Sequence, residues 1–402
     1  MKSRSQRYAV LESIVLSILG IGAYNAVIQL LIYPFLSRQL GAETFGQTLT
    51  LLSVMTVPAI CVGAGINYAR MANVPRFDAS NGDYNRCLLP GAAAVAVLCA
   101  AALFYFDAAH PASWALFPLL GVAATLRYYG SVAFRLEVNY RKNLLFYLLL
   151  SAGYALGLGL FRLTGVWETA LLCGEALAVG YVTLRSPVLR RPFWTTTENA
   201  RAVRRSCAAL IPAQFFSNLT LHADRLLIGA LLDGEQVTIF YTASLLGKAM
   251  AMLTEPIAGV AIGYLARAKR FGRREFSLCA LGSLALGALC CLVFIPLSPF
   301  LIGLLYPDVA AQSAPLFLVA NGGQIVYFTA NLLLVIVLRF AAEKYQFYIN
   351  VTYCAAFFAV CIPALLHGGL SLFCTAVLLL NALRLAAVLL LGFRKSKEVT
   401  NV

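Results

Sequence analysis

Charged residues are scarce in this chain. Of its 402 residues, 12% are charged and 61% are hydrophobic, and the mean hydropathy is +0.80. A soluble globular domain has about twice that share of charged residues, so a soluble domain is excluded as the main part of the chain. The composition instead predicts an all-α polytopic membrane protein.

Histidine is also rare. The three histidines, His110, His222 and His367, lack the spacings typical of metal ligands, so we expect no metal and no cofactor. Eleven cysteines are present, but they lie in apolar runs or in connections that we expect to be cytoplasmic. This distribution argues against a disulfide framework.

Long apolar runs fill nearly the whole sequence. A membrane-spanning helix needs about 20 predominantly apolar residues, and about twelve such runs occur. The longest basic connection, 185–206, contains two prolines and separates six runs from six. We therefore predict an N-terminal lobe at 1–190, a cytoplasmic linker at 191–206 and a C-terminal lobe at 207–402. The predicted spans are 10–36, 46–69, 88–106, 114–134, 144–162, 167–185, 207–232, 237–265, 277–297, 313–338, 348–366 and 370–392.

Basic residues outnumber acidic residues, 31 to 17, and they are unevenly distributed. Alternate connections and the two termini hold 25 of the 31, whereas the intervening connections hold only Arg38 and Arg162. Because short cytoplasmic loops are enriched in Lys and Arg, both termini are predicted to be cytoplasmic and the number of spans to be even. The positive charge thus orients the protein in a cytoplasmic (inner or plasma) membrane, and we expect no nucleic-acid partner.

Three stretches resemble the landmarks of a known family. They are "YPFLSRQLGAETFGQTLTLLS" from Tyr33, "HADRLLIGALLDGEQVTIFYTASLLGKA" from His222 and "LLYPDVAAQSAPLFLVANGGQIVYF" from Leu304. The chain resembles the polysaccharide repeat-unit flippases, the polysaccharide transport branch of the multidrug/oligosaccharidyl-lipid/polysaccharide exporter (MOP) superfamily. Thr238 stands where the second stretch usually has Gly.

The resemblance implies twelve transmembrane helices in two six-helix lobes around a central cavity that opens alternately to each side. It also implies a flippase that moves a polyprenyl-diphosphate-linked oligosaccharide to the outer leaflet for cell-surface polysaccharide biosynthesis. The implied partners are this lipid-linked substrate, membrane lipids, H⁺ or Na⁺, and other glycan-assembly membrane proteins.

Span seven carries ionisable residues in its middle. His222 and Arg225 share one side of the predicted helix with Gln214 and Asn218, and Asp224 flanks them. Ionisable groups inside a span usually face a protein interior or a water-filled path. Cavity lining and structural pairing between helices are both open for Asp224 and Arg225.

Three other cations lie inside spans. Lys248 is expected near the midplane, whereas Arg127 and Arg384 lie nearer the inner face, where long side chains reach headgroups. Arginine and lysine both bind phosphate, so Arg225, Lys248, Arg127 and Arg384 are the candidate substrate-binding residues. The first expectation is that Arg225 and Lys248 hold the diphosphate.

The acidic residues inside spans are candidate ion-coupling residues: Asp224, Glu175 and Glu255. A buried carboxylate in a transporter takes up a proton or sodium ion, although pairing with a nearby cation is the plainer interpretation of each. Glu255 precedes Pro256, where an interrupted helix exposes backbone carbonyls. The spacing of Gly153 and Gly157 predicts a close contact between helices.

Two alternative functions are open. A cation-coupled multidrug antiporter of the same superfamily is favoured by an acidic cavity, whereas several of the mid-membrane charges here are cations. A polytopic glycan polymerase or ligase would present catalytic groups on a sizeable outer loop, and the predicted outer connections are short. The prediction is therefore a transporter and not an enzyme.

Overall fold

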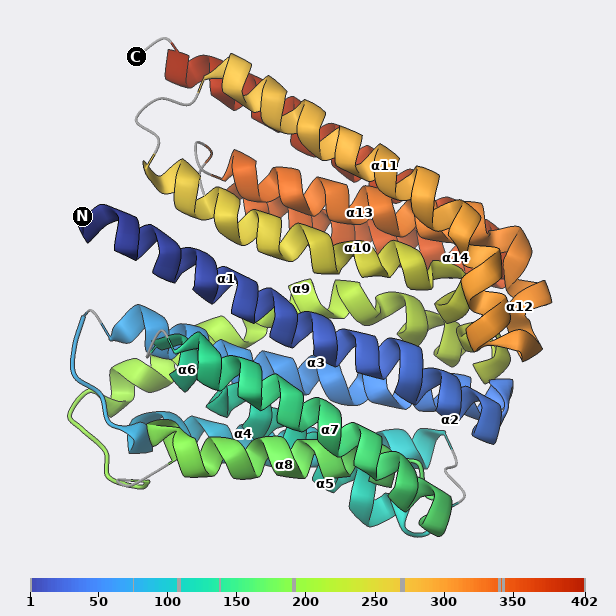
Figure 1. The fold of residues 1–402 in the computed structure, drawn as a ribbon, viewed down its shortest axis with the longest axis horizontal. Coiled ribbons are helices and arrows are strands. Elements are labelled where there is room, and N and C mark those ends of the chain that lie inside the picture. The colour runs from blue at the N-terminus through green and yellow to red at the C-terminus, as the bar shows by residue number, and fades with distance from the viewer. Residues whose placement is uncertain are drawn as a thin grey trace. The chain divides into compact units, whose positions relative to one another are not determined.

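The computed structural model describes the chain except for residues 1, 75, 107–109, 137–138, 190–192, 268–271, 339–340, 342–343 and 401–402. Helices joined by short connections make up the described residues, which include no β-strand (Figure 1). This confirms the predicted all-α class. The α-helices are α1 (Lys2–Ala26), α2 (Tyr33–Leu40), α3 (Ala42–Asn73), α4 (Asn81–Tyr105), α5 (Ser113–Gly130), α6 (Val132–Leu136), α7 (Tyr140–Thr164), α8 (Glu168–Arg185), α9 (Ala200–Leu231), α10 (Gly234–Arg267), α11 (Arg273–Leu305), α12 (Pro307–Ser313), α13 (Phe317–Val337) and α14 (Lys344–Thr400).

The chain forms two compact units. The N-terminal unit comprises Met1–Gly41 and Gln47–Leu226, and the C-terminal unit comprises Ala42–Gly46 and Leu227–Val402. The division between the units falls inside α9, and the first turn of α3 belongs to the C-terminal unit although the rest of α3 belongs to the N-terminal unit. The sequence instead predicts a lobe boundary in the linker 191–206. The lobe limits stay a prediction.

In the N-terminal unit, α7 packs along α8, α8 packs on α5, and α5 packs on α4 (Figure 1). The predicted contact at Gly153 and Gly157 is confirmed, because a Cβ atom at either position would collide with the backbone of α8 at Gly174 or Ala170. These glycines let the two helices approach closely, and this approach positions the polar residues described below.

In the C-terminal unit, α13 lies against α10, α11 and α14. Its core at one end of α13 contains Phe276 from α11, Leu333 and Val337 from α13, and Val388 from α14, all fully buried. The helix α14 consists of two segments separated at Gly369, where φ is 59°. That break lies between the predicted spans 348–366 and 370–392.

Seven helical stretches among the described residues are long and apolar enough to cross a membrane. They contain nine of the twelve predicted spans, because Val15–Asn73 and Tyr348–Ser396 each contain two. The other three predicted spans coincide with α5, α8 and α9, which carry Arg127, Glu175 and Asp224.

The first predicted span, 10–36, is not a regular α-helix. A six-residue π-helix, Val27–Ile32, separates α1 from α2. Such segments shift the register of a helix and often occur near functional sites. Gly41 then ends α2 with φ 78° and ψ 164°, a conformation that residues with a side chain rarely adopt, and α3 begins directly after it.

Candidate functional site

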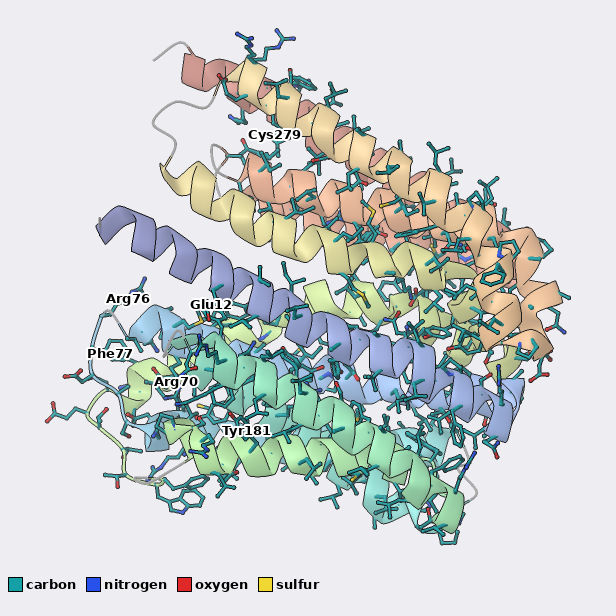
Figure 2. All side chains as sticks on the ribbon, viewed as in Figure 1. Glu12, Arg70, Arg76, Phe77, Tyr181 and Cys279 are labelled. Carbon is teal, nitrogen blue, oxygen red and sulfur yellow. The ribbon has the colours of Figure 1, made fainter. Side chains whose placement is uncertain are left out.

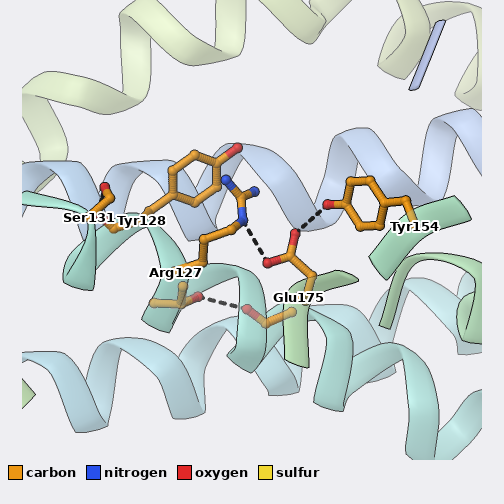
Figure 3. A network of polar contacts seen from close by, with 7 residues as sticks. Arg127, Tyr128, Ser131, Tyr154 and Glu175 are labelled. Atoms are coloured by element: carbon orange, nitrogen blue, oxygen red, sulfur yellow. Dashed lines mark hydrogen bonds and ion pairs between the residues drawn. The ribbon is translucent and has the colours of Figure 1, made fainter. Parts of the chain in front are cut away.

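A buried ion pair lies at the centre of the N-terminal unit. Nε of Arg127, on α5, donates a hydrogen bond to Oε2 of Glu175, on α8, over 2.6 Å (Figure 3). The two side chains are only 7% and 4% exposed. Each buried charge is stabilised by the other, because a buried ion without a partner loses its hydration and gains nothing in return.

Tyrosine side chains surround this pair. The Tyr154 hydroxyl, on α7, donates to Oε1 of Glu175 over 2.7 Å, so both carboxylate oxygens are engaged (Figure 3). The guanidinium carbon of Arg127 lies 4.1 Å from the ring centre of Tyr128 and 6.0 Å from that of Tyr24 on α1. Aromatic faces attract a cation, so the rings stabilise the charge that Glu175 neutralises.

Local sequence explains why Tyr154 reaches Glu175. Tyr154 follows Gly153, which contacts the backbone of α8, and the Tyr154 ring occupies the space that a side chain at Gly174 would need. Gly174 directly precedes Glu175, so this close packing brings the phenol and the carboxylate together. A larger residue at Gly174 would displace the ring that donates to Glu175.

We call Arg127, Glu175, Tyr154, Tyr24 and Tyr128 the buried tyrosine–ion-pair centre. Its groups have opposite charges and come from four helices, so its geometry depends on how α1, α5, α7 and α8 pack. Each carboxylate oxygen of Glu175 accepts one hydrogen bond in this conformation. A proton or cation that binds Glu175 offsets the carboxylate charge and so weakens the bonds with Arg127 and Tyr154.

The candidates on α9 belong to the N-terminal unit. Asp224 is 5% exposed, and its carboxylate accepts a hydrogen bond from the backbone N–H of Arg225 over 2.8 Å. Arg225 itself is partly buried. The side chains at 224 and 225 diverge by about 100° on a helix, so this contact to the backbone leaves the guanidinium of Arg225 directed elsewhere.

The remaining candidates belong to the C-terminal unit. Lys248 on α10 is partly buried, with Nζ 5.5 Å from the ring centre of Phe240. Arg384 on α14 is 6% exposed, and its guanidinium contacts the rings of Tyr327 and Tyr353. The side chain of Glu255 lies outside the described residues.

Among the candidates whose side chains the structure describes, Arg127 and Glu175 form an ion pair between two helices. Sequence reasoning assigns the two residues separate roles and does not predict their pairing, since 48 positions separate them. Sequence reasoning also missed Glu168, at the start of α8, which is fully buried. Its place at the edge of a predicted span made it resemble an ordinary first-turn acid, and only its burial singles it out.

The three stretches that suggested a family meet in the C-terminal unit. Glu43 accepts hydrogen bonds from the backbone N–H groups of Gly234 and Glu235 at the start of α10, over 3.2 and 2.8 Å. The Phe45 ring contacts those of Tyr241 and Tyr306, at centroid distances of 6.1 and 6.2 Å.

Glycine is required where these stretches meet. A Cβ atom at Gly46 would overlap the backbone of Gly234, so the two helices approach there as closely as backbones allow. The Thr238 hydroxyl donates to the Ala42 carbonyl oxygen over 2.6 Å, which gives this threonine a role at the position where the resembled pattern has Gly. Residues from all three stretches thus meet at one junction between helices.

No protein-family model and no curated protein matches the chain. Solved structures do match it over nearly their whole length. A multidrug resistance MATE family transporter of the MOP superfamily in its outward-facing conformation is 12% identical, with a TM-score of 0.63 and coverage of 98% of this chain and 96% of that one. A Vibrio cholerae MATE transporter is 15% identical, with a TM-score of 0.62 and coverage of 97% of each chain.

A third similar structure is a MOP superfamily transporter from Pyrococcus furiosus, described by the reverse polarity of its binding pocket, which suggests a different function. It is 13% identical, with a TM-score of 0.64 and coverage of 98% of this chain and 96% of that one. The protein is a multi-pass membrane protein with the MATE transporter fold. A likeness at this level of identity shows the fold alone, and the polysaccharide branch that the sequence stretches resemble is not confirmed.

Proposed function

We propose that the protein is an alternating-access transporter that exports small organic molecules in exchange for H⁺ or Na⁺, with the buried tyrosine–ion-pair centre as its coupling site. The observation that carries this proposal is the Arg127–Glu175 pair, buried among four helices of a transporter fold. Inward-facing and outward-facing conformations are known for this fold, which supports alternating access.

The centre suggests how coupling works. Protonation of Glu175 removes its negative charge, so Arg127 loses its counter-ion and must find another negative partner or water. A sodium ion binding to Glu175 has the same consequence, because it repels the guanidinium. Either ion therefore changes the packing of α5 against α8, and such a change is what links ion binding to substrate access. Asp224 and Glu255 stay proposed coupling residues beside Glu175.

Transport by protein reconstituted in liposomes tests this proposal. With an organic cation such as ethidium as the probe, a proton or sodium gradient should accelerate transport by the wild type, and Glu175→Gln should remove that acceleration. Glu12→Gln is the matched control, since Glu12 pairs with Arg141 over 2.7 Å but both side chains are exposed. Equal gradient dependence in wild type and Glu175→Gln contradicts the proposed coupling site.

A second candidate function is flipping of a polyprenyl-diphosphate-linked oligosaccharide. It is favoured by basic residues inside helices, Arg225, Lys248 and Arg384, and by the three sequence stretches described above. Under this proposal Arg225 and Lys248 bind the diphosphate, and other glycan-assembly membrane proteins are partners. Movement of a fluorescent lipid-linked oligosaccharide across the same liposomes, with no ethidium transport, would select this function over export of small molecules.

The cellular setting is proposed on the charge pattern alone. The basic connections place both termini in the cytoplasm and the protein in the inner or plasma membrane. In either function the substrate then leaves the cytoplasmic side. Labelling of the connections, described in the Discussion, tests this orientation without a transport assay.

A further inference from the structure

Two arginines, one in each unit, have similar aromatic surroundings. Arg127 lies over the ring of Tyr128, at 4.1 Å, in the N-terminal unit. Arg384 lies over the rings of Tyr327 and Tyr353, at 4.6 and 5.0 Å, in the C-terminal unit. Both are about equally buried, at 6% exposed. The aromatic rings stabilise each cation by cation–π attraction.

The two arginines differ in the hydrogen bonds that their guanidinium groups donate. Arg127 donates to the carboxylate of Glu175, but Arg384 has no carboxylate partner among the described residues. Nη2 of Arg384 donates to Oδ1 of Asn350 over 3.2 Å, and its buried Nε and Nη1 have no hydrogen-bond partner in the part of the chain that the structure describes. A buried charge with unmet donors is costly, so this arrangement calls for an acceptor.

Arg70 on α3, labelled in Figure 2, is another stacked arginine without a carboxylate partner among the described residues, and its Nε also lacks a hydrogen-bond partner there. Its guanidinium lies 4.2 Å from the ring centre of Tyr84 and donates to Asn81 Oδ1 over 2.8 Å and to the Tyr129 hydroxyl over 2.7 Å. Two short hydrogen bonds to neutral acceptors thus replace the carboxylate there. Arg384 has one, and it is longer.

The groups beside Arg384 are fixed and polar. Asn381 is 1% exposed; its Oδ1 accepts from the Tyr353 hydroxyl over 2.7 Å, and its Nδ2 donates to the Gly323 carbonyl oxygen over 2.9 Å. These bonds hold the Tyr353 ring against the guanidinium. Asn350, which accepts from Nη2 of Arg384, is only partly buried.

We propose that Arg384 binds the anionic group of a ligand, a carboxylate or a phosphate, within the C-terminal unit. The ligand's acidic group has the role that Glu175 has for Arg127: it accepts hydrogen bonds from the guanidinium, which keeps its contacts with the tyrosine rings. A headgroup phosphate of an anionic lipid and a free soluble anion share this chemistry. The site depends on neither proposed function, because it is defined by binding and not by transport.

Binding is measured as the shift in the thermal unfolding temperature of purified full-length protein. In neutral detergent, pyrophosphate and acetate are titrated against sodium chloride of equal ionic strength. In lipid nanodiscs, phosphatidylglycerol is compared with phosphatidylcholine. We expect stabilisation beyond the salt control in at least one arm: response to the soluble anions indicates a free ligand, and response only to phosphatidylglycerol indicates a lipid.

Three variants locate the binding. Arg384→Gln should weaken the response at least about tenfold, since a hydrogen bond to a charged group is lost together with the charge. Asn350→Asp places a carboxylate where Asn350 Oδ1 now accepts; it should raise the unfolding temperature of the ligand-free protein and abolish the response. Arg273→Gln is the matched control, because Arg273 is exposed and stacks on Phe393 at 5.9 Å in the same unit. It should respond like the wild type.

Asn350→Asp keeps the proposal testable if Arg384→Gln does not fold. A response of Asn350→Asp equal to that of the wild type overturns the proposal, as does a lower unfolding temperature of this variant without ligand. Lack of stabilisation by every soluble and lipid-borne anion also overturns it. Since ion-coupled transport is assayed separately, its failure leaves the binding result intact.

Discussion

Nε of Arg127 lies 2.6 Å from Oε2 of Glu175, and both side chains are almost completely buried. Glu175→Gln should lower the free energy of unfolding by about 3–5 kcal/mol, because it leaves a buried guanidinium without its counter-ion. The double variant Arg127→Met with Glu175→Leu should recover most of this loss, since no charge is then left unpaired. Thermal unfolding in detergent measures both.

The same double variant separates stability from function. It should be folded but without ion-dependent transport, because neither group of the pair remains. A double variant that is no more stable than Glu175→Gln would show that the unpaired charge is not the source of the lost stability.

Asp224→Asn should also impair transport, while leaving the unfolding temperature close to that of the wild type.

Arg225 is predicted to act through its charge. Arg225→Lys should keep part of the transport activity, Arg225→Ala should lose most and Arg225→Glu should lose all, with protein levels unchanged. The reason is that lysine keeps the charge without the planar fork of arginine. Transport is measured in liposomes with either candidate substrate.

A structural role for Arg225 predicts a different pattern. Exchanging the charges at Asp224 and Arg225 should then restore the activity of Arg225→Glu. Full activity of Arg225→Ala would likewise show that the guanidinium does not contact the substrate.

Glu43 caps α10 through two backbone N–H groups, those of Gly234 and Glu235. Glu43→Ala should destabilise the protein by about 1 kcal/mol, as expected for a lost helix cap. Gly46→Ala should cost about 1–3 kcal/mol, because its methyl group would overlap the backbone of Gly234. Asp308→Asn, at an exposed acid in the first turn of α12, is the control and should leave the unfolding temperature unchanged.

The orientation in the membrane is predicted from the 25 basic residues in alternate connections and termini. In a cysteine-free background, single cysteines placed in 186–206 or 267–276 should be protected from a membrane-impermeant thiol reagent in intact cells. They should become labelled once the membrane is opened. Labelling in intact cells would reverse the predicted orientation.

The sequence predicts the features that repeat along a helix. Apolar runs locate the helices, and the spacing of Gly153 and Gly157 correctly predicts a close helix contact. By contrast, the pairing of Arg127 with Glu175 depends on which helices are neighbours, and no local pattern contains that information. The sequence therefore identified both residues as buried charges but assigned them separate roles.

The motif around Glu43 is a different case. The sequence shows that its residues resemble a family pattern. What these residues contact depends on how α3 and α10 pack. Glu43 and Gly234 are 191 positions apart, so neither stretch alone reveals what its Gly or Glu contacts. Thr238, which departs from the resembled pattern, bonds to the same junction.

The distance in sequence between Glu43 and Gly234 also means that the two sides of the junction are synthesised at different times. The first turn of α3 leaves the ribosome long before the residues that it contacts, and at about 5–20 residues per second the 191 intervening residues take roughly 10–40 s to make. During that time the Glu43 carboxylate lacks the N–H groups that it later caps. Insertion of the early helices must therefore tolerate an incomplete junction, because the first turn of α3 is bound only after α10 has been made.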